Sequence, residues 1–487
     1  MKPTLIFSAL ALAAAASVSA TPVVHARAPA PYIPAAGAVS FPIRAPESPA
    51  TRMRRRLRRR KMIRMLQRRG DSTAEVSITN DYSDGAYLAT VTLGTPAQSV
   101  ELQVDTGSAD LWVESSSNSD CSDNACSTTG SFNSSASSTY SDSSTADFSI
   151  TYADGSTASG AYVQDTLKIS NVTITDFTFG LATSSSTSTL GVLGVGFDAD
   201  EAATTTYENL PDRLYSDGAI AVKAYSLWLN DADASEGTLL FGGIDTDKYT
   251  GDLQTIDIVA TSGSTYTQFE VEMTKFVYND AGNSTTMSSD TVDVVLDSGT
   301  TYAVLPTELV ESLASAMDST EYDEDYGVYI VDCTLQDSTT KNVTLTFGSS
   351  ANFTVGLSSL VVTLEYSVEG STETPTLCAL GIETYTDSSD SGASTVQSST
   401  TYILGDAFLR AGYFVFDLTN KQVSVAQAVF DTTASSITAL SSGGVSGSSE
   451  TGTGSTGSSS SSSAAGRRKV ASAVAVGVAM LVGVLVV

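Results

Sequence analysis

Histidine is almost absent from this chain of 487 residues, in which His25 is the only one. It lies in an N-terminal stretch that we expect to be removed, so the mature protein would contain none. Ser-His-Asp and Cys-His catalysis both need an imidazole base, and the usual histidine-bearing zinc sites need an imidazole ligand. The sequence therefore predicts no metal and no other cofactor, and carboxylates dominate the acid–base groups that remain.

Basic residues are scarce beyond residue 70. Between Asp71 and Leu440 there are 52 acidic and eight basic residues, a difference of 44 negative charges at neutral pH. Such a surface repels phosphates, which argues against a nucleic-acid partner. Its self-repulsion falls once carboxylates are protonated, so we expect a protein that works in acid.

The N-terminal residues have the pattern of targeting and processing segments. Residues 1–20 contain an apolar stretch and end in Val18-Ser19-Ala20, as in a secretory signal peptide; a short membrane anchor is the alternative. Residues 21–70 hold seven of the twelve prolines, then a basic block that ends at the dibasic pair Arg68-Arg69. We interpret residues 21–70 as a basic propeptide that docks on the acidic domain until low pH or cleavage releases it.

The four cysteines of a secreted chain are expected to form disulfides. Three pairings are possible, and the most local choice is Cys121 with Cys126 and Cys333 with Cys378, one pair in each half of the chain. Five Asn-x-Ser/Thr sequences are candidates for N-glycosylation. They begin at Asn133, Asn171, Asn283, Asn342 and Asn352.

The C-terminal residues resemble a GPI-attachment signal. Residues 433–466 are rich in Ser, Gly and Thr, which predicts a flexible stalk, with attachment somewhere in Ser458–Gly466. Residues 467–487 contain a basic cluster and an apolar run, and we expect this tail to be removed. A membrane-spanning helix is the alternative, but the 18 residues of Val470–Val487 are barely long enough. The expected location is the outer face of the plasma membrane or the cell wall.

The body of the chain alternates apolar and polar residues over short runs that end at Gly, Asn, Asp or Ser, for example from Tyr87 to Leu93. This period of two predicts an all-β protein. Helical pattern is scarce, and its best candidate is Glu308–Met317, after a proline. The length predicts two lobes around a cleft, residues 71–235 and 236–432.

Two short segments carry the functional signal. Asp105-Thr106-Gly107-Ser108 follows the alternating run Val100–Val104, and Asp297-Ser298-Gly299-Thr300 follows Val292–Leu296. Two such turns facing each other would bring together two carboxylates that share one proton. That arrangement activates water without a metal, a cofactor or a covalent intermediate. Each turn alone could be an ordinary Asp-Gly turn, but the matched pair is harder to explain in that way.

An internal repeat supports the pairing of the two turns. Downstream of each turn lies an apolar segment with a central glycine, Gly194 in the first half and Gly405 in the second. A glycine there would let a strand pass close to the aspartate turn.

With these residues assembled, the chain resembles the pepsin-like aspartic endopeptidases over residues 81–430. The resemblance implies an all-β, bilobal pepsin-like fold with a deep active-site cleft between two related lobes. Both local disulfides fit the family pattern, and a third one in pepsin has no counterpart here. Together with the propeptide and the GPI signal, the chain is similar to fungal yapsin-type, surface-anchored members. The segments that carry the resemblance are Leu93–Pro96, the two aspartate turns, Trp112, Ile150–Ser156, Phe241–Asp245, Ile403–Arg410 and Val415–Asp417.

The resemblance implies a role for each residue of the turns. Asp105 and Asp297 would hold a water between them, one as base and the other as acid. The second residues, Thr106 and Ser298, would lock the two loops to each other. Glycine follows in both turns, at Gly107 and Gly299. The fourth residues, Ser108 and Thr300, would bond the outer carboxylate oxygens.

The resemblance also implies a flap over the site. Tyr152 would lie at its tip and bond to Trp112, although either could be an ordinary buried aromatic. Asp154 and Gly155 follow, and a carboxylate near the primary pocket would favour a basic P1 side chain. The Ser-rich stretch Ser115–Ser144 has no long acidic insertion, so we expect tolerance of Lys and Arg at P1, not strict selection.

The expected partners are protein or peptide substrates, the chain's own propeptide and a GPI lipid, with the protein a monomer. The alternative function is that of a catalytically inactive, pepsin-like wall protein that binds peptide or glycan. Such proteins usually lose an aspartate or its glycine, and both turns are intact here.

Overall fold

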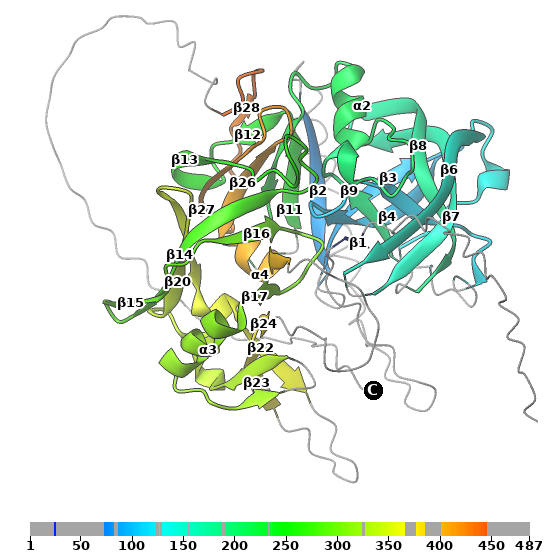
Figure 1. The fold of residues 1–487 in the computed structure, drawn as a ribbon. Coiled ribbons are helices and arrows are strands. Elements are labelled where there is room, and N and C mark those ends of the chain that lie inside the picture. Colours follow the sequence, from blue (N-terminus) through cyan, green and yellow to red (C-terminus); the bar gives the residue numbers. More distant parts are fainter. Residues whose placement is uncertain are drawn as a thin grey trace, which may run out of the picture.

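The structure, a computed structural model, shows two lobes built almost entirely of β-strands (Figure 1). This confirms the predicted all-β, bilobal fold class. Some strands alternate buried and half-buried residues, as in β20, and others are buried throughout because both faces are covered, as in β26. The structure describes residues 24–25, 73–81, 86–119, 121, 126, 129–153, 155–186, 190–231, 234, 236–323, 327–365, 376–384 and 401–445.

The described part of the first lobe is a set of strands with a few short helical segments. Its strands are β3 (Ala86–Leu93), β4 (Gln98–Asp105), β5 (Leu111–Glu114), β6 (Ser141–Tyr152), β7 (Thr157–Ile169), β8 (Val172–Ser185) and β9 (Gly191–Gly194). Its helical segments are η2 (Ser134–Ala136), η3 (Asp198–Asp200) and α2 (Leu210–Ser216).

The second lobe contains a sheet of eight strands and a smaller one of four. The larger sheet comprises β14 (Glu270–Asp280), β15 (Asn283–Ser288), β16 (Val292–Leu296), β17 (Ala303–Leu305), β20 (Asn342–Phe347), β21 (Ala351–Gly356), β24 (Ile382–Thr384) and β25 (Tyr402–Leu404). The smaller comprises β18 (Tyr322–Asp323), β19 (Val328–Val331), β22 (Val361–Glu365) and β23 (Thr376–Leu380). The helical segments are α3 (Thr307–Ala316), η4 (Cys333–Asp337), η5 (Leu357–Ser359) and α4 (Asp406–Leu409).

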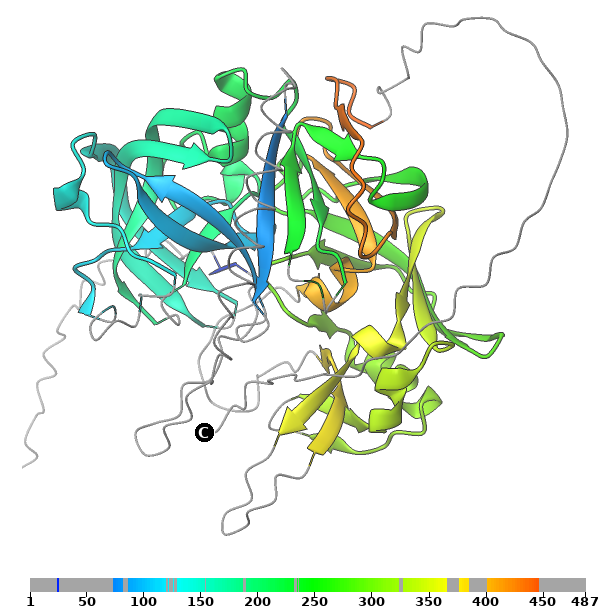
Figure 2. The same ribbon diagram turned by 180° about the vertical axis from the view of Figure 1, so that it is seen from behind.

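A shared sheet joins the two lobes. Strand β2 runs between them, and both views show it in the middle of the molecule (Figures 1 and 2). The first-lobe strand β10 pairs with β26, which comes almost 200 residues later. The two lobes therefore share one continuous sheet. The strands of this region are β2 (Ala74–Asp81), β10 (Ala224–Trp228), β11 (Glu236–Phe241), β13 (Tyr249–Asp257), β26 (Gly412–Asp417) and β27 (Gln422–Ala428).

The second lobe extends past residue 432, where the sequence predicted a stalk. Strand β28 (Ile437–Ala439) pairs with β12 (Gly243–Asp245). Asp245 Oδ1 accepts the backbone N–H of Ser436 at 2.7 Å, and Leu440 is buried. A segment rich in Ser and Thr is thus part of the fold up to residue 445, because its backbone completes a strand pair.

The predicted targeting segments fall largely outside the described residues. These segments are the signal peptide, the GPI-attachment region and the C-terminal apolar tail. Of the predicted propeptide the structure describes only β1 (Val24–His25), which pairs in parallel with Thr151 and Tyr152 of β6. Within the described part of the chain, no helix has the length and apolar character needed to cross a membrane.

Candidate active site

Each aspartate turn lies at the end of a buried strand. Asp105 is the last residue of β4, and Asp297 directly follows β16. In both lobes a second strand runs parallel beside the turn, with Gly194 of β9 opposite Asp105 and Leu404 of β25 opposite Leu296. The predicted repeat is therefore a repeat of structure, and it places the two turns in equivalent positions.

Glycine is required where these neighbouring strands pass the turns. A Cβ atom on Gly194 would lie 2.6 Å from the backbone nitrogen of Asp110, and one on Gly405 would overlap the carbonyl oxygen of Tyr302. The geometry agrees with the expected close approach of strand and turn.

The two carboxyl groups face each other across the glycines of the turns. A Cβ atom on Gly107 would lie 2.5 Å from Asp297 Oδ1, and one on Gly299 would overlap Asp105 Oδ1. Each glycine N–H also donates to the inner oxygen of its own aspartate, at 2.8 Å in the first turn and 2.7 Å in the second. Asp105 and Asp297 are both buried, with exposed fractions of 1% and 0%.

Hydroxyl groups hold the outer carboxyl oxygens. Ser108 Oγ donates to Asp105 Oδ2 at 2.5 Å, and Thr300 Oγ1 donates to Asp297 Oδ2 at 2.6 Å. Each carboxyl group is therefore fixed at both oxygens, so its plane cannot rotate without breaking a hydrogen bond.

Thr106 and Ser298 fasten the turns to each other. Thr106 Oγ1 donates to the carbonyl of Leu296 at 2.8 Å and accepts the N–H of Ser298 at 2.9 Å. In the mirror arrangement, Ser298 Oγ donates to the carbonyl of Val104 at 2.9 Å and accepts the N–H of Thr106 at 3.2 Å. Four buried bonds between the lobes set the separation of the two carboxyl groups.

The electrostatics of the site favour one shared proton. Burial raises the pKa of Asp297 well above its ordinary value, and the neighbouring Asp105 carboxylate raises it further. Hydrogen bonds from Thr300 and Gly299 oppose this shift. The raised pKa lets Asp297 keep a proton at pH values where an ordinary carboxyl group is ionised, so the pair can hold one proton between its two carboxyl groups.

The predicted flap is the hairpin between β6 and β7. Tyr152 ends β6, and its backbone bonds across the turn to Ser156 and Gly155. The indole N–H of Trp112 donates to the Tyr152 hydroxyl at 2.7 Å, and both side chains are buried. Gly155 has φ +80° with open space around its Cα, and Asp154 lies outside the described residues.

Two polar residues at the site were not among the predicted ones. Gln103 Nε2 donates to the carbonyl of Gly299 at 3.1 Å. Asp110 Oδ1 accepts the hydroxyls of Tyr162 and Tyr207 at 2.7 and 2.8 Å. The period of two places Gln103 on the same face of β4 as Asp105, but it does not indicate the partner, which lies in the other lobe.

The structure contains both expected disulfides, Cys121–Cys126 in the first lobe and Cys333–Cys378 in the second. The side chains of four candidate glycosylation sites are exposed; these are Asn133, Asn171, Asn283 and Asn352. Asn342 differs, because it is half-buried in β20 and its Oδ1 accepts a hydrogen bond from Asn279 at 2.7 Å.

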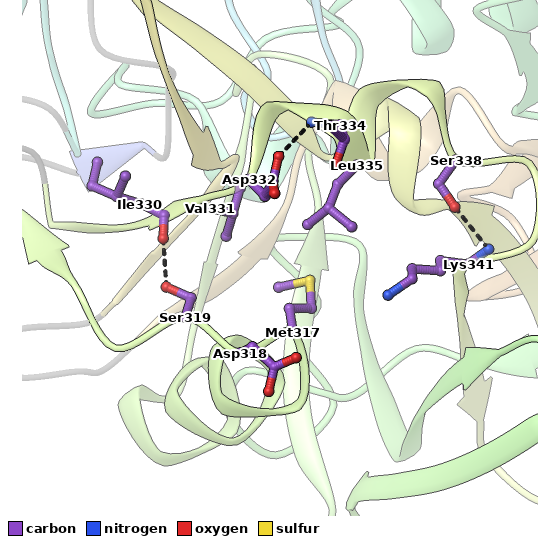
Figure 3. A pocket seen from close by; sticks show the side chains of 10 residues that line it. All are labelled: Met317, Asp318, Ser319, Ile330, Val331, Asp332, Thr334, Leu335, Ser338 and Lys341. Carbon is purple, nitrogen blue, oxygen red and sulfur yellow. Dashed lines mark hydrogen bonds between the residues drawn. The ribbon is translucent and has the colours of Figure 1, made fainter.

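A cavity of about 480 Å³ lies in the second lobe between the end of α3 and η4 (Figure 3). Met317 and Leu335 contribute apolar surface to it, and Lys341 lies at its edge. None of the residues of the aspartate turns lines this cavity, so the candidate site does not depend on it.

Two β-rich lobes that hold a pair of buried, facing carboxyl groups define an aspartic-type peptide hydrolase. The sequence profile of the family described as "Eukaryotic aspartyl protease" matches residues 86–428 of the chain. The chain belongs to this family.

Named relatives occur in several fungi. The chain is 37% identical to the "Probable aspartic-type endopeptidase opsB" of Aspergillus oryzae, over 78% of this chain and 75% of the relative. It is 36% identical to an "Acid protease" of Saccharomycopsis fibuligera, over 75% and 86% of the two chains. It is 35% identical to "Secreted aspartic protease 9" of Candida albicans, over 66% and 56%.

Proposed function

We propose that this protein is a secreted, cell-surface aspartic endopeptidase that hydrolyses peptide bonds at acidic pH. The observation that carries the proposal is the pair of buried carboxyl groups of Asp105 and Asp297. They face each other, are fixed at every oxygen by turn residues, and belong to turns locked together across the lobes. The acidic surface and the name of the Saccharomycopsis relative support an acidic working range.

In the proposed reaction, ionised Asp105 takes a proton from a water molecule held between the carboxyl groups. The water oxygen attacks the scissile carbonyl carbon, while Asp297 gives its proton to the carbonyl oxygen. The tetrahedral intermediate then collapses: its C–N bond breaks, the leaving nitrogen receives a proton from Asp105, and Asp297 recovers one from the intermediate's hydroxyl. Burial and the neighbouring Asp105 carboxylate support the protonated form of Asp297, and hydrogen bonds from Gly107 and Ser108 hold the Asp105 carboxyl group in place.

The test is hydrolysis of a mixed peptide library at about pH 4 by the processed protein, with and without pepstatin, beside Asp105→Asn. Asp105→Asn has almost the same shape but cannot act as a base. We expect both the substitution and the inhibitor to abolish cleavage. If folded, propeptide-free protein cleaves nothing, the proposal fails and the inactive peptide- or glycan-binding wall protein becomes the better interpretation.

We further propose that the site tolerates Lys or Arg at P1, with Asp154 as the carboxylate that attracts them. The same library gives the P1 profile of the wild type and of Asp154→Ala. A reduced yield of Lys and Arg products in the variant is the expected result. A profile limited to large apolar P1 residues, and unchanged in Asp154→Ala, would contradict the proposal.

The targeting proposals rest on the sequence and on one relative's name. The signal peptide and the name "Secreted aspartic protease 9" support secretion, and the small-residue region Ser458–Gly466 with its apolar tail supports a GPI anchor of the yapsin type. In cells that express the full-length chain, a phosphatidylinositol-specific phospholipase is expected to release the processed protein. Retention after that treatment would favour a membrane-spanning tail.

We also propose that residues 21–70 form an inhibitory propeptide. If Arg68-Arg69 is altered so that processing stops, the protein should stay inactive at neutral pH, and full activity there would refute the proposal. Asn133, Asn171, Asn283 and Asn352 are exposed and are the favoured glycan acceptors over Asn342. Mass spectrometry of peptides before and after deglycosylation distinguishes these sites.

A further inference from the structure

The two aspartate turns match at each of their four positions but differ in the strands that lead to them. Two residues before Asp105 stands Gln103, and two residues before Asp297 stands Val295. Alternate residues of a strand share a face, so both positions lie on the same face as their aspartate. The first position carries a hydrogen-bond donor, whereas valine has none.

Gln103 is buried and not solvated. Its exposed fraction is 3%, and its neighbours Leu102 and Val104 point to the opposite face, into the main hydrophobic core. A buried carboxamide costs free energy unless it is hydrogen-bonded. A leucine or valine at this position would avoid that cost, so the polar group calls for a specific explanation.

The partner of Gln103 lies in the opposite turn. Its Nε2 donates to the carbonyl oxygen of Gly299 at 3.1 Å, across 196 residues of sequence. That carbonyl belongs to the peptide that joins Gly299 to Thr300. On one side of this peptide, the N–H of Gly299 donates to Asp297 Oδ1, and on the other the hydroxyl of Thr300 donates to Asp297 Oδ2.

We infer that Gln103 is a positioning residue for the second turn: from the first lobe it orients the Gly299–Thr300 peptide, and thereby both groups that hold the Asp297 carboxyl. The inference deepens the proposed hydrolysis and rests on it. The Thr106 and Ser298 bonds set the distance between the turns, and the Gln103 bond sets the rotation of the second turn. The second lobe has Val295 at the equivalent position, and a valine side chain makes no such bond to the first turn. The two carboxyl groups are therefore not equivalent, although their turns are.

The main test is Gln103→Met, which keeps the size and loses the donor, with Gln103→Val as a second variant that copies Val295. With a peptide that the wild type cleaves, we expect kcat to fall by about five- to tenfold, as for one lost hydrogen bond in the reacting state, with KM nearly unchanged. Titration with pepstatin gives the concentration of intact sites. The matched control is Gln164→Met, since Gln164 Nε2 donates to Thr178 Oγ1 at 3.1 Å within the first lobe; its kcat should match the wild type.

Gln103→Glu provides a rescue that depends on pH. A protonated glutamic acid can donate to the Gly299 carbonyl, whereas a carboxylate cannot. At about pH 3 this variant should exceed Gln103→Met in kcat, and the excess should disappear as the pH rises through the pKa of the introduced glutamic acid, which burial raises. A purely structural role for the side chain would not produce this dependence on pH.

Hydrogen exchange separates this inference from the proposed activity. Deuterium uptake in a peptide that covers residues 297–301 should be faster in Gln103→Met than in the wild type and in Gln164→Met, whether or not the protein is active. Unchanged uptake and unchanged kcat in both Gln103 variants would overturn the inference and leave the proposed function intact. A rise in KM alone would also overturn it, because it would make Gln103 a contact of the substrate.

Discussion

Serine and threonine hydroxyls control both carboxyl groups of the site at the level of single residues. Each aspartate has one hydroxyl on its outer oxygen and one glycine N–H on its inner oxygen. These donors favour the charged form of a carboxyl group, while burial and the opposite carboxylate disfavour it. Removing one donor should therefore change the pKa of the carboxyl group that it bonds. The effect of each donor can be tested by the pH dependence of the rate.

Thr300→Ala should move the alkaline limb of the pH–rate profile to higher pH. The hydrogen bond from Thr300 lowers the pKa of Asp297, against the larger effect of burial. Without it, the carboxyl group keeps its proton to higher pH, and kcat should fall by about three- to tenfold because the group is less well oriented. The measurement is kcat against pH. Thr300→Ser keeps a hydroxyl and should restore the profile; an alkaline limb that moves to lower pH would contradict the assignment.

The residues of the turns could be predicted from sequence because the signal is local. Asp105 and Asp297 each lie next to the glycine and the hydroxyl that hold them, so four consecutive residues contain the motif. Gln103 could not be assigned in the same way. Its partner Gly299 is distant in sequence, and a glutamine in an alternating strand has no single structural meaning until the opposite lobe is placed.

Asp110, which directly precedes β5, connects the first turn to the β6–β7 hairpin. Its carboxylate accepts hydroxyls from Tyr162 on β7 and Tyr207, and the N–H of Ala202 at 2.8 Å. The Phe148 ring packs between Trp112 and Tyr162, at centroid distances of 6.1 and 5.4 Å. Trp112, which bonds to Tyr152, and the side chains at the base of the β6–β7 hairpin therefore form one packed unit.

Asp110→Ala should destabilise this unit more than Tyr162→Phe does. The first change leaves two tyrosine hydroxyls and one N–H without their acceptor, at a cost of about 1–3 kcal/mol for each group that stays buried. The second removes a single donor and leaves the carboxylate with two, which costs about 1 kcal/mol. Urea unfolding of the three proteins measures the difference. Equal losses of unfolding free energy would show that Asp110 does not organise the unit.

Element boundaries were predicted well where apolar periodicity was strong and less well where it was weak. The expected helix Glu308–Met317 corresponds to α3, Thr307–Ala316, because Leu309, Val310 and Leu313 form its buried face. Strand β28 was missed, since Ile437 and Leu440 are isolated among Ser and Thr. Its stability comes from backbone pairing with β12, which the composition of the segment does not reveal.

At the scale of the whole molecule, buried carboxyl groups couple stability to pH. Burial raises the pKa of Glu201 to about 9 and that of Glu383 to about 7, and it raises the pKa of Asp406 as well. A group of this kind binds its proton more tightly in the folded state than in the unfolded state. Its contribution is complete below the ordinary glutamate value of 4.5 and is lost as the pH rises through the folded value.

The unfolding midpoint temperature should therefore fall between about pH 5 and about pH 8. Glu201→Gln removes one of the responsible groups. The midpoint temperature of this variant should therefore fall less over that interval than that of the wild type, by roughly 2–4 °C, which is the effect of about 1 kcal/mol in a domain of this size. Glu272→Gln, an exposed carboxylate on β14, serves as the control for the change in net charge. Thermal unfolding followed at several pH values gives the result, and an equal fall in all three proteins would exclude a role for Glu201.

The shared sheet also determines when the site can exist during synthesis. Strand β10 acquires its partner β26 only after residues 412–417 have been made, and the bonds between the two turns join residues 192 apart. A first lobe still attached to the ribosome contains the site carboxyl group of Asp105. The second one, Asp297, is not yet in place to share a proton with it. Pairings over such separations form late and slowly. The growing chain and its neighbours are therefore not exposed to a peptide-cleaving site until nearly the whole catalytic body has emerged and the last strands have joined the first.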